Sequence, residues 1–588
     1  MGHHTQHVLG SRVTDKGVDF SVWAPFAKSV TVLVGEPYNW EETPLTNTDG
    51  TWSGFVENAQ TGQSYKYRIE TQDGTFLEKN DPRARQLTAS EEGSSVIIDP
   101  HYDWEGSESP VIDKNKQIIY ELHIGTFNRP DVATVGTFLS AIEKLDYLQS
   151  LGITTIELMP VTSIAMSNGW GYAPNHLFSV ESTYGGRHGL LDFVKAAHQR
   201  GLAVILDVVY NHFSAQTDMW QYDGWSEDNR GGIYFYNDER VETPWGGRPD
   251  YGRPEVRDYV LDNVTMWLNE YRIDGLRVDS TTYMRNTKGP YGDESTEIAD
   301  AWTLLQEMTT LAHKVNPHSL IVAEDSSMDE AVTQPVKDGG AGFDAQWGLA
   351  FPHTLRSLLG LEEEPYGNTL ASEIKHIYNN DSFQKVIFSD SHDTAANGSV
   401  RLNEAASPGN AGSLSARQYG LLANSVTLTS AGIPLLLQGS EFLQEGAFND
   451  WQMLEWERTQ QFAGIVLAHQ HVINLRLNRY GNTAGLIGPN SNVFHDDSKQ
   501  KVIAYHRWNE GGPLDDTIVI INASDEQFDE YSFTFPIPGE WHVRFNSSWR
   551  GYSTDFSETN ITTVTTDEKG VAKLPLADYN VLILSQNA

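Results

Sequence analysis

The chain has 588 residues, no cysteine, and a formal net charge of −38 from 41 basic and 79 acidic residues. This length is too great for one hydrophobic core, and the missing cysteines exclude disulfides, thiolate metal sites and a cysteine nucleophile. The negative charge argues against nucleic acid and anionic membranes as partners, so a neutral ligand is easier to accommodate.

The sequence also lacks the signals that would direct a chain to or across a membrane. No run of about 18 apolar residues occurs. Residues 1–13 have neither the basic nor the apolar region of a secretory signal. Together with the absence of cysteine, this leads us to expect a cytoplasmic protein.

The first part of the chain is predicted to be a β-sandwich. Between residues 13 and 98, short segments alternate apolar and polar residues, as in 18–23, 30–32 and 65–69. After residue 101 the pattern changes, and apolar strand-like runs begin to alternate with amphipathic helical stretches.

The middle of the chain predicts a parallel barrel of the α/β class. Strands are expected at 118–127, 154–160, 202–212, 273–279, 320–325, 341–348, 385–393 and 433–442. Helical patterns lie between most of them, for instance at 136–152, 189–201, 254–271 and 297–316. Eight strands that alternate with helices indicate a (β/α)8 TIM barrel, although a doubly wound open sheet is the structural alternative.

From about residue 481 the pattern returns to short strands, at 502–508, 517–522, 531–535, 541–545 and 580–584. This predicts a second β-sandwich. We therefore expect three domains: an N-terminal β-sandwich at 1–108, a catalytic barrel at 109–478 and a C-terminal β-sandwich at 479–588.

Polar residues at the ends of the predicted barrel strands are the candidates for chemistry, because the active site of such a barrel lies at the carboxyl ends of its strands. Arg277 and Asp279 are two residues apart and should point to the same side, where the arginine would keep the carboxylate ionised. Glu324 follows three apolar residues, which favours a protonated form suited to a general acid. Asp393, next to His392, ends the seventh strand.

Three carboxylates at one barrel mouth fit glycoside hydrolysis with retention, which needs a nucleophile and an acid/base about 5 Å apart. A metal site is the competing use of such a cluster, since acidic oxygens suit a hard cation. The arginine in the middle of the cluster argues against a cation there. For the pair of Arg277 and Asp279 alone, a buried structural ion pair is the other interpretation.

Four motifs at these strand ends are similar to those of the α-amylase superfamily, glycoside hydrolase family 13. They are DVVYNH at 207–212, GLRVDS at 275–280, AED at 323–325 and SHD at 391–393, in the order that the family shows. The resemblance implies that Asp279 is the nucleophile and Glu324 the acid/base. It also implies that Asp393 orients sugar hydroxyls and stabilises the transition state.

The same resemblance implies roles for five further residues. Arg277 would hold Asp279 ionised, and Asp207 would support the site from the neighbouring strand. His212 and His392 would bond hydroxyls of the sugar at the cleavage point. Tyr172, in the segment 168–172, would stack under that sugar, although packing within the loop is the alternative.

The remaining motifs bear on the subfamily. GVDFSVWAP at 17–25 and NDPRARQ at 80–86 resemble the starch-binding-type module that precedes the barrel in branching, debranching and trehalose-releasing members. Segments 250–257, 267–279 and 340–347 look most like glycogen branching enzymes. YELHIGTF at 120–127 and ELMPV at 157–161 are seen in trehalose-releasing members too.

Two departures from branching enzymes lie on the acceptor side of the expected site. Thr394 stands where they usually carry Glu or Gln, and residues 280–286 read STTYMRN where they continue Ala-Val and a Tyr-rich segment. Asn211 occupies the position of a calcium ligand in many amylases, but branching-type members generally lack this ion. We therefore expect neither a metal nor an organic cofactor.

The sequence thus predicts a 1,4-α-glucan branching enzyme that acts on α-glucan oligo- or polysaccharides. A hydrolase is the alternative, such as a maltooligosyl-trehalose trehalohydrolase or an amylase-like enzyme. A non-catalytic glucan-binding protein on the same fold is the third hypothesis, and it should be indifferent to Asp279→Asn.

Overall fold

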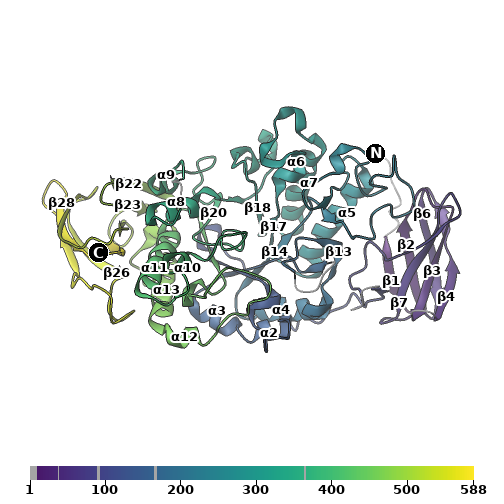
Figure 1. The fold of residues 1–588 in the computed structure, drawn as a ribbon, viewed down its shortest axis with the longest axis horizontal. Helices are drawn as coiled ribbons and strands as arrows, with labels where there is room; N and C mark the ends of the chain where they lie inside the picture. Colours follow the sequence, from purple (N-terminus) through teal and green to yellow (C-terminus); the bar gives the residue numbers. More distant parts are fainter. Residues whose placement is uncertain (1–8, 37–38, 89–92, 165–168, 363–365) are drawn as a thin grey trace.

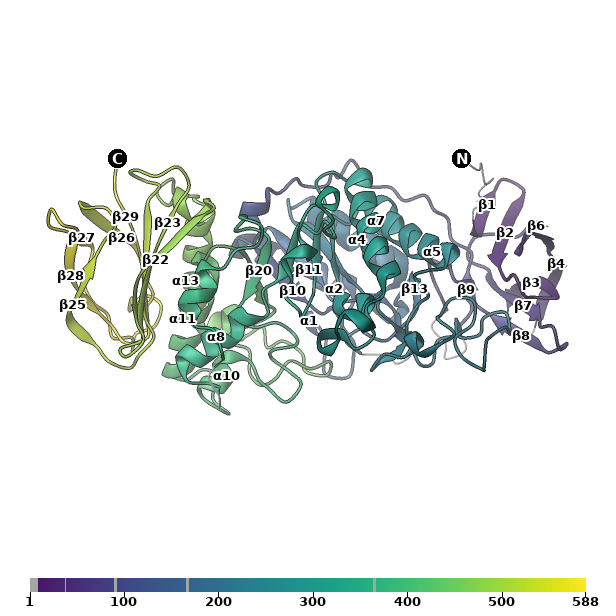
Figure 2. The same ribbon diagram turned by 90° about the horizontal axis from the view of Figure 1, so that it is seen from above.

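A computed structural model describes residues 9–36, 39–88, 93–164, 169–362 and 366–588 of the chain. Figure 1 shows its parts in a row, with the N-terminal strands at one end, a central mass of helices and strands, and the C-terminal strands at the other end. The view from above in Figure 2 shows the same order. No described helix is long and apolar enough to cross a bilayer.

The central part is a closed parallel barrel, as the sequence predicts. In the described residues its strands are β10 (Ile119–Leu122), β11 (Thr155–Leu158), β14 (Ala203–Val208), β17 (Gly275–Val278), β18 (Leu320–Ala323), β19 (Ala345–Trp347), β20 (Lys385–Phe388) and β21 (Ile433–Leu437). β21 pairs with β10 and closes the ring. Each strand is shorter than predicted. Residues such as Val209 and Tyr210, which follow β14, are buried but do not pair with a neighbouring strand, so the apolar pattern extends beyond the end of the strand.

The helices around the barrel also follow the predicted pattern, with two differences. α4 (Gly186–His198) and α7 (Ala299–Val315) lie where they are expected. The segment 136–152 forms two helices, α2 (Phe138–Ile142) and α3 (Leu145–Leu151), and Thr137 caps the first of them. α5 (Pro254–Thr265) continues into a π-helical turn at Met266–Glu270.

The N-terminal part is a pair of antiparallel sheets. One contains β1 (Gly10–Thr14), β2 (Gly17–Trp23), β6 (Thr51–Glu57) and β5 (Thr46–Thr48). The other contains β4 (Asn39–Pro44), β3 (Ser29–Glu36), β7 (Ser64–Glu70), β8 (Phe76–Lys79) and β9 (Ser95–Val96). Phe20 and Tyr65 meet between the sheets with ring centroids 5.0 Å apart. This confirms the predicted N-terminal β-domain.

The C-terminal part is likewise antiparallel. Its larger sheet orders β22 (Asn490–Asp497), β23 (Val502–Trp508), β24 (Thr517–Asn522), β29 (Asn580–Ser585), β26 (Glu540–Asn546) and β27 (Thr563–Thr565). β25 (Phe528–Thr534) pairs with β28 (Val571–Leu576), and an apolar cluster that includes Trp541 and Leu582 fills the space between. The exact domain boundaries at 108/109 and 478/479 stay a prediction.

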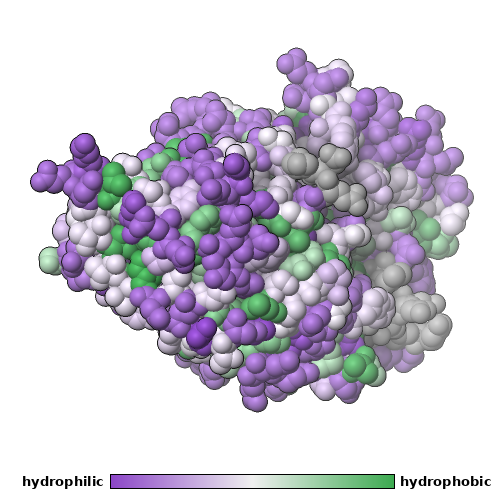
Figure 3. Space-filling view, turned by 60° about the vertical axis from the view of Figure 1, so that its left-hand side comes forward, coloured by the Kyte–Doolittle hydropathy of each residue, from purple (hydrophilic) through white to green (hydrophobic). Residues whose placement is uncertain are grey.

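The surface agrees with the acidic composition. On the face shown in Figure 3, hydrophilic side chains prevail and hydrophobic ones are scattered in small groups. Solvated carboxylates keep such a surface in water, which is the ordinary use of a large net charge.

Candidate active site

The barrel register brings the predicted site residues to one edge. β14 and β17 are paired so that Asp207 lies opposite Arg277. Asp279 directly follows β17, Glu324 directly follows β18, and Asp393 comes five residues after the end of β20. Because all the strands are parallel, these ends meet at the carboxyl edge of the barrel.

Arg277 lies at the centre of this group and is fully buried. Its Nη1 donates to Asp207 Oδ2 at 2.7 Å and to Asp279 Oδ1 at 2.8 Å. Its Nη2 lies 3.3 Å from Glu324 Oε2. One guanidinium therefore contacts both predicted catalytic carboxylates through its two terminal nitrogens.

Asp279 accepts hydrogen bonds on both carboxylate oxygens. Arg277 donates to Oδ1, and Asn211 Nδ2 donates to Oδ2 at 2.7 Å. The Asp279 side chain is only 13% exposed, so water does little to stabilise its charge. Donors on both oxygens fix the orientation of the carboxylate, as attack on a carbon atom requires.

Glu324 has a different environment. Its Oε2 accepts the Ser280 backbone N–H at 2.8 Å, and its side chain is 16% exposed. Burial, together with the charges of Asp279 and Asp393, raises the pKa of Glu324 to about 7 against the opposing effect of Arg277. A carboxyl group that keeps its proton near neutral pH can serve as a general acid.

Asp393 is the most exposed of the three carboxylates, at 47%. Its Oδ2 lies 3.5 Å from His392 Nε2. His392 is buried, and its Nδ1 lies 2.5 Å from Glu121 Oε1. Burial lowers the pKa of His392, but Asp393 and Glu121 outweigh it and raise the pKa to about 9, so the ring carries a proton on each nitrogen.

Tyr172 contacts two residues of this group, Asp207 and His392. Its hydroxyl donates to Asp207 Oδ2 at 2.6 Å, and its ring stacks on His392 at 5.1 Å between centroids with an 18° angle. Asp207 is buried, and its Oδ1 makes no protein hydrogen bond. Burial raises the pKa of Asp207 to about 7, although Arg277 opposes this shift.

His212 is held by protein atoms on both ring nitrogens. Nε2 lies 2.8 Å from the Tyr172 carbonyl oxygen, and Nδ1 lies 2.5 Å from Asn211 Oδ1. Both partners are acceptors, which favours the protonated ring, whereas burial lowers the pKa of His212. A sugar hydroxyl could bond this ring only by displacing one of these partners.

Two glutamates in the barrel interior were not identified from the sequence. Glu121 of β10 accepts the His392 backbone N–H at 3.0 Å as well as contacting its ring. Glu157 of β11 lies opposite Glu121 in the register, and neither of its carboxylate oxygens makes a protein hydrogen bond. Burial and the neighbouring Glu121 raise the pKa of Glu157 well above its ordinary value. The sequence signal that could have identified these two glutamates is the single acidic residue within each of the strands β10 and β11.

The departures from branching enzymes have local structural roles. Ser280 adopts a left-handed backbone with φ of 42°, which turns its N–H toward Glu324. Thr281 Oγ1 and Arg285 both donate to Asp325, so these two positions anchor the loop after β18. Thr394 Oγ1 accepts the Ser391 N–H at 2.8 Å and closes a turn.

An aromatic residue that the sequence did not single out lies beside the site. Trp245 is 49% exposed, and its ring centroid lies 5.4 Å from that of His212 and 4.8 Å from that of Tyr283. An exposed indole next to a site histidine is a ready surface for a sugar ring.

We find no cluster of three or more His, Asp or Glu side chains arranged for a metal ion in the described part of the chain. Asn211, at the position of a calcium ligand in many amylases, has its amide turned to Asp279 and its oxygen to His212. This environment does not fit a cation.

Comparison with known families agrees with the geometry. The alpha amylase catalytic domain model matches residues 122–249 and 223–466, which together make up more than half of the chain. The chain belongs to the α-amylase family. The model of carbohydrate-binding module 48, the isoamylase N-terminal domain, matches residues 8–84, and the alpha amylase C-terminal all-beta domain matches residues 493–587. This confirms the family predicted from the strand-end motifs.

Relatives within the family differ in activity. A 1,4-alpha-glucan branching enzyme of Oceanobacillus iheyensis is 30% identical over 93% of this chain and 88% of its own length. One of Corynebacterium jeikeium is 29% identical over 93% of this chain and 78% of its own. A malto-oligosyltrehalose trehalohydrolase of Saccharolobus solfataricus is 32% identical over 62% of this chain and 59% of its own.

Solved structures show the same fold. A pullulanase of Paenibacillus barengoltzii in complex with maltohexaose and alpha-cyclodextrin matches with a TM-score of 0.78 at 20% identity, covering 100% of this chain and 96% of its own. A type I pullulanase of Bacillus subtilis in complex with maltose matches with a TM-score of 0.77 at 21% identity, covering 100% and 86%. As a family member, the chain is an α-glucan-active enzyme of the retaining hydrolase or transglycosylase kind.

Proposed function

We propose that the protein is a 1,4-α-glucan branching enzyme, which moves a segment of α-1,4-glucan to a 6-hydroxyl of another glucan. The chemistry is supported by one observation above all: Arg277 contacts both Asp279 and Glu324, and the pKa of Glu324 is raised to about 7, as a general acid requires. The choice of branching is supported by the relatives that cover 93% of the chain.

In the first step, Asp279 attacks the anomeric carbon of the bound glucan while Glu324 gives its proton to the departing glycosidic oxygen. Arg277 and Asn211 donate to the two oxygens of the attacking carboxylate and keep it oriented. A covalent glycosyl-enzyme results, and Glu324 is left as a carboxylate.

The neighbouring residues bind the sugar at the cleavage point. Asp393, half-exposed at the mouth, accepts hydrogen bonds from ring hydroxyls and stabilises the positive charge that develops in the transition state. The protonated His392 donates to a hydroxyl from Nε2 because Glu121 holds its Nδ1. Tyr172 and His212 line the same sugar, and Asp207 holds Tyr172 and Arg277 in place.

In the second step, Glu324 removes the proton from the incoming 6-hydroxyl as its oxygen attacks the anomeric carbon. The α-configuration is retained after two inversions. Water competes for the same position, so the outcome depends on how well the acceptor side holds a glucan.

A hydrolase is the second candidate, and the similarity to a trehalohydrolase at 32% identity favours it specifically. Thr394 and the segment after Asp279 also depart from branching enzymes on the acceptor side. In that case water takes the glycosyl group, and trehalose or short glucans leave.

Incubation with amylose separates the two candidates. A branching enzyme should reduce the blue iodine colour and create α-1,6 signals by NMR with few new reducing ends. A rise in reducing ends without α-1,6 signals would overturn the proposal in favour of a hydrolase. Free trehalose from a maltooligosyl-trehalose substrate would identify the hydrolase.

We also propose that the substrate is cytoplasmic glucan, since the chain has no cysteine.

A further inference from the structure

Two buried glutamates lie inside the barrel, directly beneath the candidate active site. Glu121 of β10 and Glu157 of β11 lie opposite each other in the strand register. Glu121 comes two residues after Ile119, a member of the apolar cluster that fills the barrel, so it points inward one layer nearer the mouth. Its register partner Glu157 points to the same side. Neither residue belongs to the four strand-end motifs.

Glu121 binds His392 at two places. Its Oε2 accepts the His392 backbone N–H at 3.0 Å, and its Oε1 lies 2.5 Å from Nδ1 of the ring. One carboxylate therefore holds both the backbone and the side chain of the same residue. The ring of His392 cannot turn without breaking its contact with Glu121, so the direction of Nε2 is fixed as well.

The other ring nitrogen of His392 points toward Asp393. Nε2 lies 3.5 Å from Asp393 Oδ2, and the ring stacks on Tyr172 with centroids 5.1 Å apart. Ionised carboxylates only accept hydrogen bonds, so a carboxylate beside each nitrogen favours the ring that carries a proton on both. A charged ring donates a hydrogen bond about twice as strong as that of a neutral ring.

Several charged or titratable side chains face His392 from the strands and loops packed against it. Burial lowers the pKa of His392, Asp393 and Glu121 raise it, and Arg277 acts in the same direction as burial. Glu121 contacts the ring at 2.5 Å, so it is closer than Asp393. The groups that face His392 are Glu121, His123, Glu157, Tyr172, Asp207, Arg277 and Asp393.

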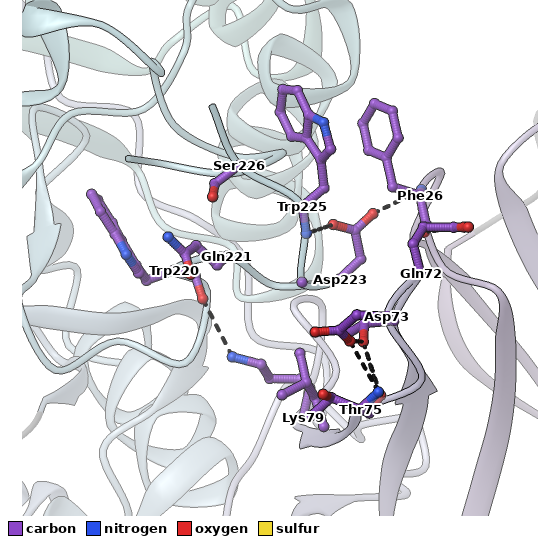
Figure 4. A pocket seen from close by; sticks show the side chains of 13 residues that line it. Phe26, Gln72, Asp73, Thr75, Lys79, Trp220, Gln221, Asp223, Trp225 and Ser226 are labelled. Carbon is purple, nitrogen blue, oxygen red and sulfur yellow. Dashed lines mark hydrogen bonds between the residues drawn. The ribbon is translucent and has the colours of Figure 1, made fainter. Parts of the chain in front are cut away.

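Glu157 lacks the donors that buried carboxylates usually have. Figure 4 shows a carboxylate that has them, at the junction of the N-terminal strands and the barrel, where Asp223 accepts the backbone N–H groups of Phe26 and Trp225 at 2.9 and 3.2 Å. In the described part of the chain, neither oxygen of Glu157 makes a hydrogen bond. An ionised carboxylate without donors is costly to bury, so Glu157 is held in its neutral form.

The two glutamates therefore share their negative charge unequally. Two carboxylates side by side in a buried place repel each other if both are ionised, which favours one proton for the pair. Glu121 has two donors from His392 and Glu157 has none, so the proton stays on Glu157 and the charge on Glu121. This distribution leaves the anion next to the ring of His392.

We propose that Glu121 is a positioning residue for His392, which fixes the ring and keeps a proton on both of its nitrogens, with Glu157 as its neutral partner. The charged ring then donates from Nε2 to the sugar hydroxyl beside Asp393. The proposal deepens the proposed function and rests on it for the identity of the sugar.

The protonation of His392 is tested without substrate, by NMR of the full chain with histidine labelled with ¹³C at Cε1. The His392 signal is assigned by its loss in His392→Asn, and its chemical shift is followed against pH. The wild-type midpoint should lie at about 9. Glu121→Gln removes the charge but keeps the size of the side chain, so the midpoint should move about one to two pH units toward acid. Glu157→Gln replaces a group that is already neutral and should leave the midpoint in place.

A double-mutant cycle tests whether Glu121 acts through His392. Cleavage of amylose is followed by the loss of iodine colour, which both branching and internal hydrolysis cause. We expect Glu121→Gln to lower kcat/KM about 10–100-fold, as loss of a charge-assisted hydrogen bond would. Glu121→Gln combined with His392→Asn should be no slower than His392→Asn alone, because the second change has nothing left to act through.

Glu441→Gln is the matched control. Glu441 is also a fully buried glutamate, but its carboxylate accepts hydrogen bonds from the hydroxyls of Tyr120 and Tyr147. This variant should leave both the His392 midpoint and the kcat/KM of the folded enzyme unchanged. If Glu121→Gln does not fold, Glu121→Asp decides instead, because its shorter carboxylate loses contact with the ring and should lower the midpoint as well.

Three results would each overturn the proposal: an unchanged midpoint in Glu121→Gln, losses that multiply in the double variant, or a midpoint that Glu157→Gln moves toward acid. The proposed function fails separately. A wild type that does not decolour amylose would contradict branching, whereas the NMR titration would still decide the role of Glu121.

Discussion

The barrel interior and the core of the C-terminal domain are equally buried but chemically different. Around Arg277 the barrel buries Asp207 and Glu157, whereas the cluster around Trp541 contains apolar side chains such as Leu582. Burying charge is costly unless it is paired, so an apolar core is the arrangement that stability alone favours. The charged barrel interior therefore indicates where structure has been arranged for chemistry.

The largest effect that would test this difference is expected at Asp279. Asp279→Asn removes the nucleophile but keeps a group of the same size beside Arg277 and Asn211. Activity on amylose should fall at least about 10⁴-fold, with an unchanged circular dichroism spectrum. A variant that retains about a tenth of the activity would contradict the assigned role and favour a non-catalytic glucan-binding protein.

Arg277→Met should destabilise the protein by about 3–5 kcal/mol, because it leaves Asp207 and Asp279 without their common cation in a buried place. Chemical denaturation measures the stability, and the rate per folded molecule measures the activity. Both should fall together. If neither the stability nor the activity fell, the carboxylates would not depend on this arginine.

The matching change in the C-terminal core is Leu582→Ala. It should cost about 2–5 kcal/mol by opening a cavity in the cluster around Trp541. The activity of the remaining folded molecules should equal that of the wild type. If activity per folded molecule dropped as it does in Arg277→Met, the contrast between the two interiors would not hold.

The pH dependence sharpens the contrast within the active site. Since the pKa of Glu324 is raised to about 7, the acid form is present below this pH and is lost above it. The kcat/KM on amylose should be level from about pH 5.5 to 6.5 and then fall about tenfold per pH unit. Glu324→Gln should remove this alkaline decline together with most of the activity. A flat profile up to pH 9 would contradict the general-acid role.

The smallest effect is expected at Glu157, whose buried carboxyl has a raised pKa and no protein hydrogen bond. Its proton is retained in the folded chain at a pH where the unfolded chain has lost it, so this group makes the protein less stable as pH rises above about 4.5. Glu157→Gln should gain at least about 1 kcal/mol over the wild type at pH 8 and nothing at pH 4. Thermal unfolding at both pH values measures this, and a loss at pH 8 would mean that Glu157 is ionised and paired.

Much of the fold was readable from the sequence because its signals are local. The eight barrel strands and the flanking sandwiches followed from apolar runs, alternation and helical periodicity within a few residues. The errors were also local: strands were extended past their last ladder pair, and one helix was expected where α2 and α3 are separate. Periodicity reports which residues are buried, and buried residues do not all belong to a strand or a single helix.

The sequence by itself determined the family, the barrel and the order of the strand-end carboxylates, because these depend on short motifs and on regular periodicity. Only the tertiary structure decided which side chains that are distant in the sequence contact one another. Glu121 holds His392 across 271 residues, and Phe26 meets Trp225 at the junction of two domains. Such contacts depend on how whole strands and domains are placed, and no pattern within a short window carries that information.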